Sequence, residues 1–321
     1  MIRPFDLRDV TLVAQLEKQG TSLNAELTLT QKPRPLQAAL ASFLSLRNLG
    51  TRTYICRGSY KHDGKHEGLA QLQPVDGTTR GHVILVAPTL AQSNGADAIW
   101  LDLLEYVGVE AASMGLLHLI AEAPEDGDEV EVLRKAGFAI YVRQDILQLD
   151  AARIPSTTAG ALRESEDVDT WAIQQLYFNT APRLAHLAEG VPLAVDQPNP
   201  HWSYVYKEQD NLVAYLEIQS GSLGAWFNIL VHPDAESRAA QIVSEGLARL
   251  GSSWNKPIFC GVRRYQEWLR RPLESLGFEP FGSSVSMVKH LAAHVIEPHL
   301  AKAQSAVLKR AKTSTPSLTR N

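Results

Sequence analysis

The sequence predicts an α+β protein built from two tandem copies of one fold. At 321 residues, the chain is about twice as long as a typical domain of ~150 residues. Apolar residues make up 45% and charged residues 21%, which is typical of a globular protein with a hydrophobic core. Two short strings also recur in the same order along the chain, and they carry most of the argument for duplication.

The first recurring string is ILVAP at 84–88, which returns as ILVHP at 229–233. The second is LRKAGF at 133–138, which returns as LESLGF at 273–278. Each member of the first pair ends an apolar, strand-like run. Each member of the second pair ends at a Gly-Phe, where glycine is typical of a helix end. Because order, spacing and local structure type agree, we expect the two halves to share one fold.

Within each copy the patterns predict a strand, one or two helices, a three-strand meander, a helix, a strand, a helix and a final hairpin. The meander is clearest in the second copy, as WSYVYKEQ, LVAYLEIQ and AWFNILV. The two starts also correspond, since Arg3 and Arg163 each precede an acidic residue and a segment with helical periodicity.

These patterns divide the chain into four parts. The first copy covers residues 1–150, a linker covers 151–160, and the second copy covers 161–292. The linker AARIPSTTAG has the Pro, Ser, Thr and Gly content of a connecting segment. Residues 293–321 form a basic tail that ends in KTSTPSLTRN, a composition that favours disorder.

Charge and composition exclude several classes of protein. The net charge of −4 argues against a nucleic-acid enzyme, since phosphate contacts need a basic face. No apolar run approaches the ~20 residues of a membrane span, so we expect a cytoplasmic protein. We also expect it to be a monomer or a homodimer. The only two cysteines, Cys56 and Cys260, lie in apolar runs and predict neither a disulfide nor a metal site. No Gly-x-Ser-x-Gly or Gly-x-Gly-x-x-Gly string suggests a hydrolase or a dinucleotide enzyme.

The strand ending in Val-x-Pro, the long helix, the next strand and the helix ending in Leu-Gly-Phe resemble the GNAT acyltransferases. The resemblance covers nearly the whole chain, once per copy. It implies two acyl-CoA N-acyltransferase folds, each a mostly antiparallel sheet flanked by helices. Each sheet would splay open between its fourth and fifth strands, with acetyl-CoA in the gap. Residues 84–86 and 229–231 would then belong to fourth strands, and residues 117–121 and 258–262 to fifth strands.

The resemblance also implies a site for acetyl-CoA, and no metal. A pyrophosphate needs uncovered backbone amides at a helix N-terminus, which glycine makes accessible. The second copy has no glycine between Pro233 and Gly246, and only Arg238 could substitute by its charge. The first copy comes closer, although Asp97 stands where a small residue is expected. Its cofactor-binding residues would be Leu85, Val86, Gln92, Asn94, Gly95, Ala96 and Ala98.

The catalytic residues are less defined by the resemblance. The family commonly places a tyrosine, as general acid, four residues before the helix-ending glycine, where this chain has Leu133 and Leu273. Glu122 and His118, near the fifth strand of the first copy, are the remaining candidates there, and Tyr265 is the candidate in the second copy.

Two functions remain open. The first is an acetyl-CoA-dependent N-acetyltransferase that acts on an amine by direct acyl transfer. The alternative is a duplicated fold that has lost its chemistry and serves as a ligand-binding or scaffold module.

Overall fold

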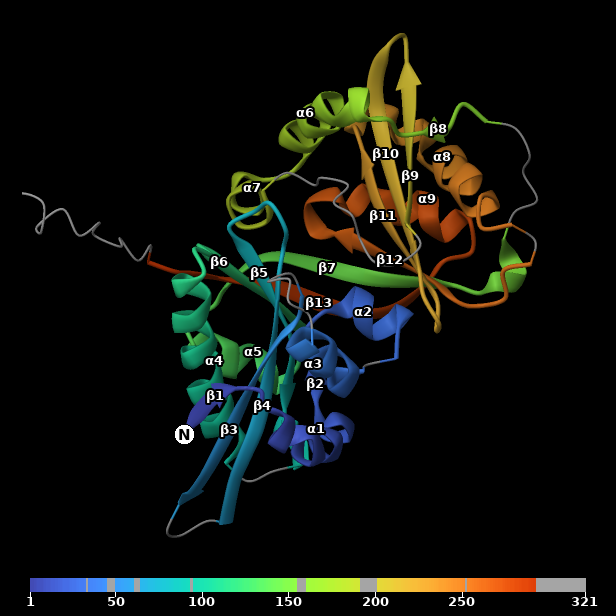
Figure 1. Cartoon of the computed structure of the whole chain (residues 1–321). Helices are drawn as coiled ribbons and strands as arrows, with labels where there is room; N and C mark the ends of the chain where they lie inside the picture. The colour runs from blue at the N-terminus through green and yellow to red at the C-terminus, as the bar shows by residue number, and fades with distance from the viewer. Residues whose placement is uncertain are drawn as a thin grey trace, which may run out of the picture.

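The computed structural model describes residues 1–32, 34–44, 50–60, 64–92, 95–154, 160–190, 201–251 and 253–292. The whole basic tail, residues 293–321, and residues 155–159 of the linker lie outside the described residues. The chain forms two lobes that share one continuous sheet, with the long strands β7 and β13 lying between the lobes (Figure 1).

The first half contains seven strands and five α-helices among its described residues. Its strands are β1 (Ile2–Pro4), β2 (Thr21–Ser22), β3 (Arg52–Tyr60), β4 (Gly64–Pro74), β5 (Arg80–Ala87), β6 (His118–Pro124) and β7 (Ala139–Leu149). Its helices are α1 (Val10–Leu16), α2 (Ala25–Thr30), α3 (Pro35–Leu44), α4 (Ala96–Ser113) and α5 (Asp128–Lys135).

The second half repeats this order, apart from an element like β2 and one of the early helices. Its strands are β8 (Arg163–Glu164), β9 (His201–Glu208), β10 (Asn211–Ser220), β11 (Ala225–Val231), β12 (Ile258–Arg263) and β13 (Glu279–His290). Its helices are α6 (Thr170–Thr180), α7 (Arg183–Glu189), α8 (Glu236–Ala248) and α9 (Arg270–Ser275). The predicted duplication of a mixed, mostly antiparallel fold is therefore confirmed.

The start of each half is held by a buried aspartate. Asp9 is 0% exposed and accepts hydrogen bonds from both terminal nitrogens of Arg3, at 2.7 and 2.8 Å. Asp169 is 1% exposed and accepts one from Arg163 at 2.6 Å. A buried carboxylate is tolerated only when it is paired and hydrogen-bonded, and both halves meet that requirement in the same way.

The two halves exchange their last strands. The order across the sheet is β1-β3-β4-β5-β6-β13-β7-β12-β11-β10-β9-β8, with β2 paired to β5. The final strand of the second half, β13, thus lies between β6 and β7 of the first half. The final strand of the first half, β7, in turn pairs with β12 of the second half.

The expected final hairpin within each copy is therefore wrong. Each half ends on a single strand, and the partner strand comes from the other half. The physical reason is that β7 runs for 11 residues without a turn and the chain then leaves for the linker, so both neighbours of β7 in the sheet, β12 and β13, come from the second half.

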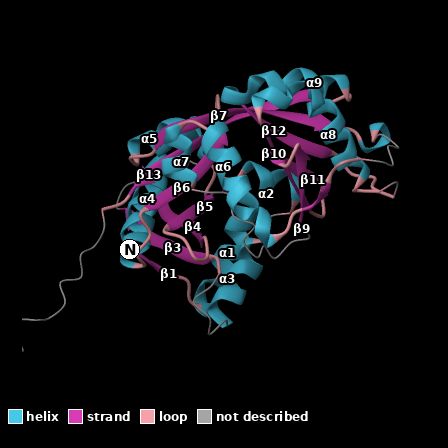
Figure 2. Cartoon of the chain, turned by 90° about the horizontal axis from the view of Figure 1, so that it is seen from above, coloured by secondary structure: helices cyan, strands magenta, loops and turns pink. Residues whose placement is uncertain are grey.

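Helices cover both faces of the sheet (Figure 2). On one face of the first half, α4 and α5 pack over the strands around Trp100, which is 0% exposed. On the matching face of the second half, α8 and α9 pack over Phe227 and its neighbours. The opposite faces carry α1 and α3 in the first half and α6 in the second.

Two helices reach across to the other half. Leu29 of α2 packs with Trp226 and Phe259 of the second half's sheet. Ala188 of α7 packs with Ile120 on β6 and Val288 on β13. Together with the exchanged strands, these contacts place α2 and α7 over the centre of the shared sheet. Within the described part of the chain, no helix is long and apolar enough to cross a membrane.

Candidate functional site

The gap between the fourth and fifth strands of the first half is filled by the chain itself. The parallel strands β5 and β6 pair from Arg80 with His118 to His82 with Ile120, and the pairing goes no further. Beyond that point, the Leu23 amide donates to the Ile84 carbonyl at 2.9 Å, and the Glu122 amide donates to the Leu23 carbonyl at 2.8 Å.

The segment just before Leu23 completes this closure. Thr21 and Ser22 form β2 and pair with Val86 and Leu85 of β5. Leu23 itself is 1% exposed and belongs to the hydrophobic core. The backbone of β5 that faces the gap is thus engaged by residues of the same half.

The predicted cofactor-binding residues of the first half separate into two groups. Leu85 and Val86 lie against β2. The others lie at the start of α4, where Gly95 has a left-handed conformation with φ of 82° and Ala96 and Ala98 form the first turn. Gln92 ends the preceding 3-10 turn, and Asn94 lies outside the described residues. Asp97 is exposed in the same turn.

Among the described residues, no segment fills the corresponding gap in the second half. The parallel pairing of β11 with β12 ends at Phe227 and Cys260. The His232 amide donates to β10 at 2.8 Å, so in the alternating antiparallel pattern the backbone groups of Ile229 and Val231 point away from β10, toward β12. No described residue makes a hydrogen bond to those groups.

A cavity of about 280 Å³ lies at this opening and extends toward the first half. Its wall combines carboxylates, two arginines and aromatic rings from both halves. The carboxylates are Glu26, Glu122, Glu189 and Glu217, the arginines are Arg80 and Arg263, and the rings are Tyr141, Tyr177, Tyr215, Trp226 and Tyr265. Ile229 and Leu230 on β11 and Gly261 on β12 also line it, so the cavity reaches both sides of the gap.

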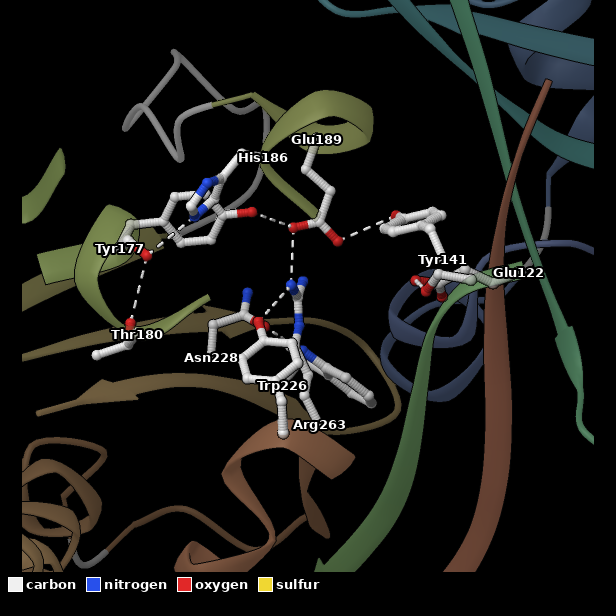
Figure 3. A network of polar contacts seen from close by, with 11 residues as sticks. Glu122, Tyr141, Tyr177, Thr180, His186, Glu189, Trp226, Asn228 and Arg263 are labelled. Carbon is white, nitrogen blue, oxygen red and sulfur yellow. Dashed lines mark hydrogen bonds and ion pairs between the residues drawn. The ribbon is translucent and has the colours of Figure 1, made fainter. Parts of the chain in front are cut away.

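A polar network centred on Glu189 crosses this cavity (Figure 3). Glu189, the last residue of α7, accepts hydrogen bonds from Arg263 at 2.7 Å, Tyr177 at 2.9 Å and Tyr141 at 3.0 Å. Burial alone would raise the pKa of Glu189, but the Arg263 guanidinium and the two phenols outweigh burial and hold it below its usual value. Glu189 and Arg263 therefore form a neutral, ionised pair.

Tyr265 differs from the other two phenols of this network. Its oxygen accepts a hydrogen bond from Arg263 at 3.0 Å, while its own proton has no acceptor among the described residues. The hydroxyl groups of Tyr141 and Tyr177 instead donate hydrogen bonds to Glu189. Burial raises the pKa of Tyr265, so the phenol stays protonated at neutral pH and can donate into the cavity.

The two predicted catalytic residues of the first half have different surroundings. Glu122 lines the cavity, where it accepts hydrogen bonds from the Ala25 amide at 2.9 Å and the Ser286 hydroxyl at 3.2 Å. Burial raises the pKa of Glu122. His118 is not part of the cavity wall, and its ring lies edge-on to His290 at 5.0 Å. The structure thus brings Glu122, but not His118, to the other site residues.

Glu26 is a further titratable group in the wall. Burial, together with the negative charges of Glu217 and Glu122, raises the pKa of Glu26 to about 8. Asn228 opposes that shift by a hydrogen bond to the carboxylate. A carboxyl group with such a pKa can hold or release a proton near neutral pH.

Sequence reasoning missed Glu26, Glu189 and the role of Arg263. Glu26 and Glu189 stand in the short helices α2 and α7, and no sequence pattern there singles them out. The one usable signal was Arg263 at the end of a predicted fifth strand, because residues at this edge of the sheet face the gap. Among the described residues, no three side chains are grouped as metal ligands.

Comparisons with known proteins identify this architecture. Models of protein families do not match the sequence, and neither do curated proteins. Solved structures do match. A tandem GNAT protein from the clavulanic acid biosynthesis pathway is similar with a TM-score of 0.53 and 13% identity, over 90% of this chain and 98% of that one. A GCN5-related N-acetyltransferase from Sphaerobacter thermophilus is similar with a TM-score of 0.52 and 11% identity, over 90% of this chain and 95% of that one. The chain therefore has the GNAT acyltransferase fold, present twice.

Proposed function

We propose that this protein transfers the acyl group of acetyl-CoA to an amine, with the donor in the open gap of the second half and the amine in the adjoining cavity. The observation that carries the proposal is the unpaired backbone of Ile229 and Val231 at the mouth of an acidic cavity. Residues 1–150 and 161–292 would be the two acyltransferase units, with the first mainly supporting the second. This places the donor in the half that the sequence disfavoured.

The pantetheine arm is the part of the donor that fits the gap. The pantetheine arm of acetyl-CoA contains amides, which can pair with the exposed strand groups of Ile229 and Val231 in the manner of an added strand. The same positions in the first half are occupied by β2. Acetyl-CoA would supply the activated thioester there.

The residues of the cavity provide the other functions of acyl transfer. Glu122 has a raised pKa and is fixed by two hydrogen bonds, so it can accept the proton of the bound ammonium group. A strand amide in the gap can stabilise the negative charge that develops on the carbonyl oxygen. Tyr265 has a free proton to give to the departing thiolate.

One observation favours the alternative function, a binding module without chemistry. Helix α8 begins with Glu236, and Asp234 lies two residues before it with an exposed side chain. Two carboxylates at this helix N-terminus oppose the diphosphate of coenzyme A. The alternative therefore requires that amines bind to the cavity while acetyl-CoA does not bind to the gap.

Hydrogen exchange with acetyl-CoA tests the position of the donor. We expect the amides of Ile229 and Val231 to exchange at least tenfold more slowly when acetyl-CoA is added, because strand amides without a partner among the described residues gain one. Peptides covering residues 84–87 should not change, since β2 already pairs with them.

Three outcomes of this experiment are distinct. Protection at residues 95–98, lost in a Gly95→Glu variant, would return the donor to the first half. No protection anywhere, combined with amine binding measured by calorimetry, would establish the binding module. Protection at β11 alone supports the proposal.

Replacing Tyr265 by phenylalanine tests the proton donor. We expect kcat to fall by about 100-fold with KM nearly unchanged, because a general acid acts in the transition state and not in binding. Steady-state kinetics with acetyl-CoA and an accepted amine would measure this. Tyr106→Phe, on α4 of the first half, is the matched control and should leave kcat within twofold. An unchanged kcat in the Tyr265 variant would contradict the assigned role.

A further inference from the structure

A second cavity, of about 310 Å³, lies at the outer edge of the first half's sheet. The edge strand β1 ends at Pro4, and the Phe5 amide then donates to the Thr53 carbonyl of β3 at 2.9 Å. Helices α3 and α4, from opposite faces of the sheet, contribute the rest of the wall. No described residue lines both this cavity and the one around Glu189. Its volume is at the small end of the range for small-molecule sites.

The hydroxyl of Tyr54 is buried in this wall without a hydrogen-bond partner among the described residues. The side chain is 2% exposed, and its ring meets Tyr106 edge-on at 5.6 Å. Burial, and then the charge of Glu110, raise the pKa of Tyr54 to about 12, so the hydroxyl keeps its proton at neutral pH. A buried donor without an acceptor costs stability, and a ligand that accepts this hydrogen bond would remove the cost.

Two opposite charges lie near this hydroxyl. The Arg52 guanidinium and the Glu110 carboxylate both line the cavity, and both act electrostatically on Tyr54. Among the described residues they form no ion pair with each other, and no other charged side chain pairs with either. Tyr106, which lies beside Glu110, is neutral. A ligand with one negative and one positive group would supply a partner for each charge.

The remaining wall suits an apolar group. Phe5 and Phe43 meet edge-on, with their ring centroids 6.1 Å apart, and Phe43 is 47% exposed although it is apolar. Ala39 adds apolar surface, and the described wall contains no charged side chain besides Arg52 and Glu110. An apolar group that packs against Phe43 would remove both surfaces from water, which favours binding.

We propose that this cavity binds a free α-amino acid with an apolar side chain. Its carboxylate binds Arg52 and accepts the hydrogen bond of Tyr54, its ammonium group binds Glu110, and its side chain packs against Phe43. An α-amino acid is the simplest molecule that carries both charges and an apolar group. A carboxylic acid would leave Glu110 without a partner, and an amine would leave Arg52 without one. Binding there does not require acyl transfer, and it gives the first half a ligand of its own.

Calorimetry on the full chain, without acetyl-CoA, tests the recognition directly. The probes are L-leucine and L-phenylalanine, the decarboxylated amine and the deaminated acid that correspond to each, and glycine, which lacks the side chain. We expect at least one of the two amino acids to bind at least tenfold more tightly than its own amine, its own acid and glycine. If neither amino acid binds, or if each binds within threefold of one of its analogues, the inference is wrong.

Variants of the two charged residues test each contact separately. Arg52→Met should remove the preference for the amino acid over its amine, and Glu110→Gln should remove the preference over its acid, each to within threefold. Arg8→Met is the matched control, since the Arg8 side chain is 90% exposed in the same half and does not line the cavity. Thermal unfolding of each variant verifies the fold. Unchanged preferences in both variants, with binding lost in Glu122→Gln, would place the amino acid in the other cavity and overturn the inference.

Replacing Tyr54 by phenylalanine separates a role in binding from a role in the fold. We expect the affinity for the amino acid to fall at least tenfold, while the melting temperature of the free protein does not fall, because the variant loses a buried donor that had no acceptor. Tyr204→Phe is the matched control, since Tyr204 is 5% exposed and lines neither cavity, and it should keep the affinity within twofold. An unchanged affinity in Tyr54→Phe, or a melting temperature several degrees lower, would contradict the assigned contact.

Discussion

Replacing Arg263 by methionine is expected to destabilise the protein by about 3 kcal/mol at pH 7.5, the low end of the range for breaking one side of a buried ion pair. Arg263 and Glu189 are 28% and 19% exposed, so water screens the pair only in part. Without Arg263, the Glu189 carboxylate keeps the hydrogen bonds of two phenols but has no neutralising charge. Urea unfolding followed by circular dichroism measures the change.

The pH dependence of this loss has a definite sign. In the native protein the folded pKa of Glu189 is depressed, so its contribution is present above the ordinary pKa of 4.5 and is lost as the pH falls through the folded value. In Arg263→Met, only the hydrogen bonds of the two phenols still oppose burial, so we expect the folded pKa of Glu189 to rise above 4.5. The variant's deficit should therefore shrink as the pH falls from 7.5 toward 5, because Glu189 becomes protonated. A deficit that is constant over this range would show that lost packing, and not charge, is responsible.

Arg264→Met provides the matched control for this experiment. Arg264 is the next residue along the chain and pairs with Glu125, but its side chain is 48% exposed. Glu125 also keeps a second partner, Arg143. The control should lose less than ~1 kcal/mol, as expected for a surface ion pair, and show little pH dependence between 5 and 7.5.

The sequence predicted the duplication because its signals are local. The Gly-Phe strings around Gly137 and Gly277 mark helix ends, and both glycines do have the left-handed conformation that stops a helix. The apolar runs that end at residues 88 and 233 could likewise be assigned to strands from period and composition. These features depend only on neighbouring residues, so one sequence is enough to predict them.

Pairing between distant strands could not be predicted in this way. A final hairpin and the observed exchange of β7 and β13 require the same alternation of apolar residues. The choice between them depends on which edges are free when the halves meet. The same holds for Thr21 and Ser22, whose two-residue strand has no pattern of its own and is defined by its place in the gap.

The candidate site was predictable only where strand position determines it. Glu122 was found because it ends a predicted fifth strand, and strands at this edge face the gap. Glu26 and Glu189 come from α2 and α7, the two helices that cross to the other half. Their place in the cavity follows from the packing of the halves, which no single segment encodes.

Removing β13 is expected to unfold both halves, and not just the half to which β13 belongs in sequence. Val285 and Met287 are 0% exposed and Val288 is 4% exposed. Val285 and Met287 belong to the first half's core, and Val288 packs on β6 and α7. Losing three such side chains removes about 5 to 8 kcal/mol of apolar burial. That amount is comparable to the whole stability of an ordinary domain, about 5 to 15 kcal/mol.

The experiment compares a chain that stops after Phe278 with a chain that stops after residue 292, which lacks only the tail beyond the described residues. In the shorter chain β6 and β7 both lose a neighbouring strand, so their amides lose protection together. We expect hydrogen exchange at residues 118–124, in the first half, to approach the rate of the unfolded chain. The control chain should keep the protection of the full protein. A synthetic peptide of residues 279–292, added in excess, should restore part of the protection at β6, because the missing strand pairs with two existing edges. A shorter chain that keeps β6 protected while only the second half unfolds would show that each half is stable alone, and would contradict a shared sheet.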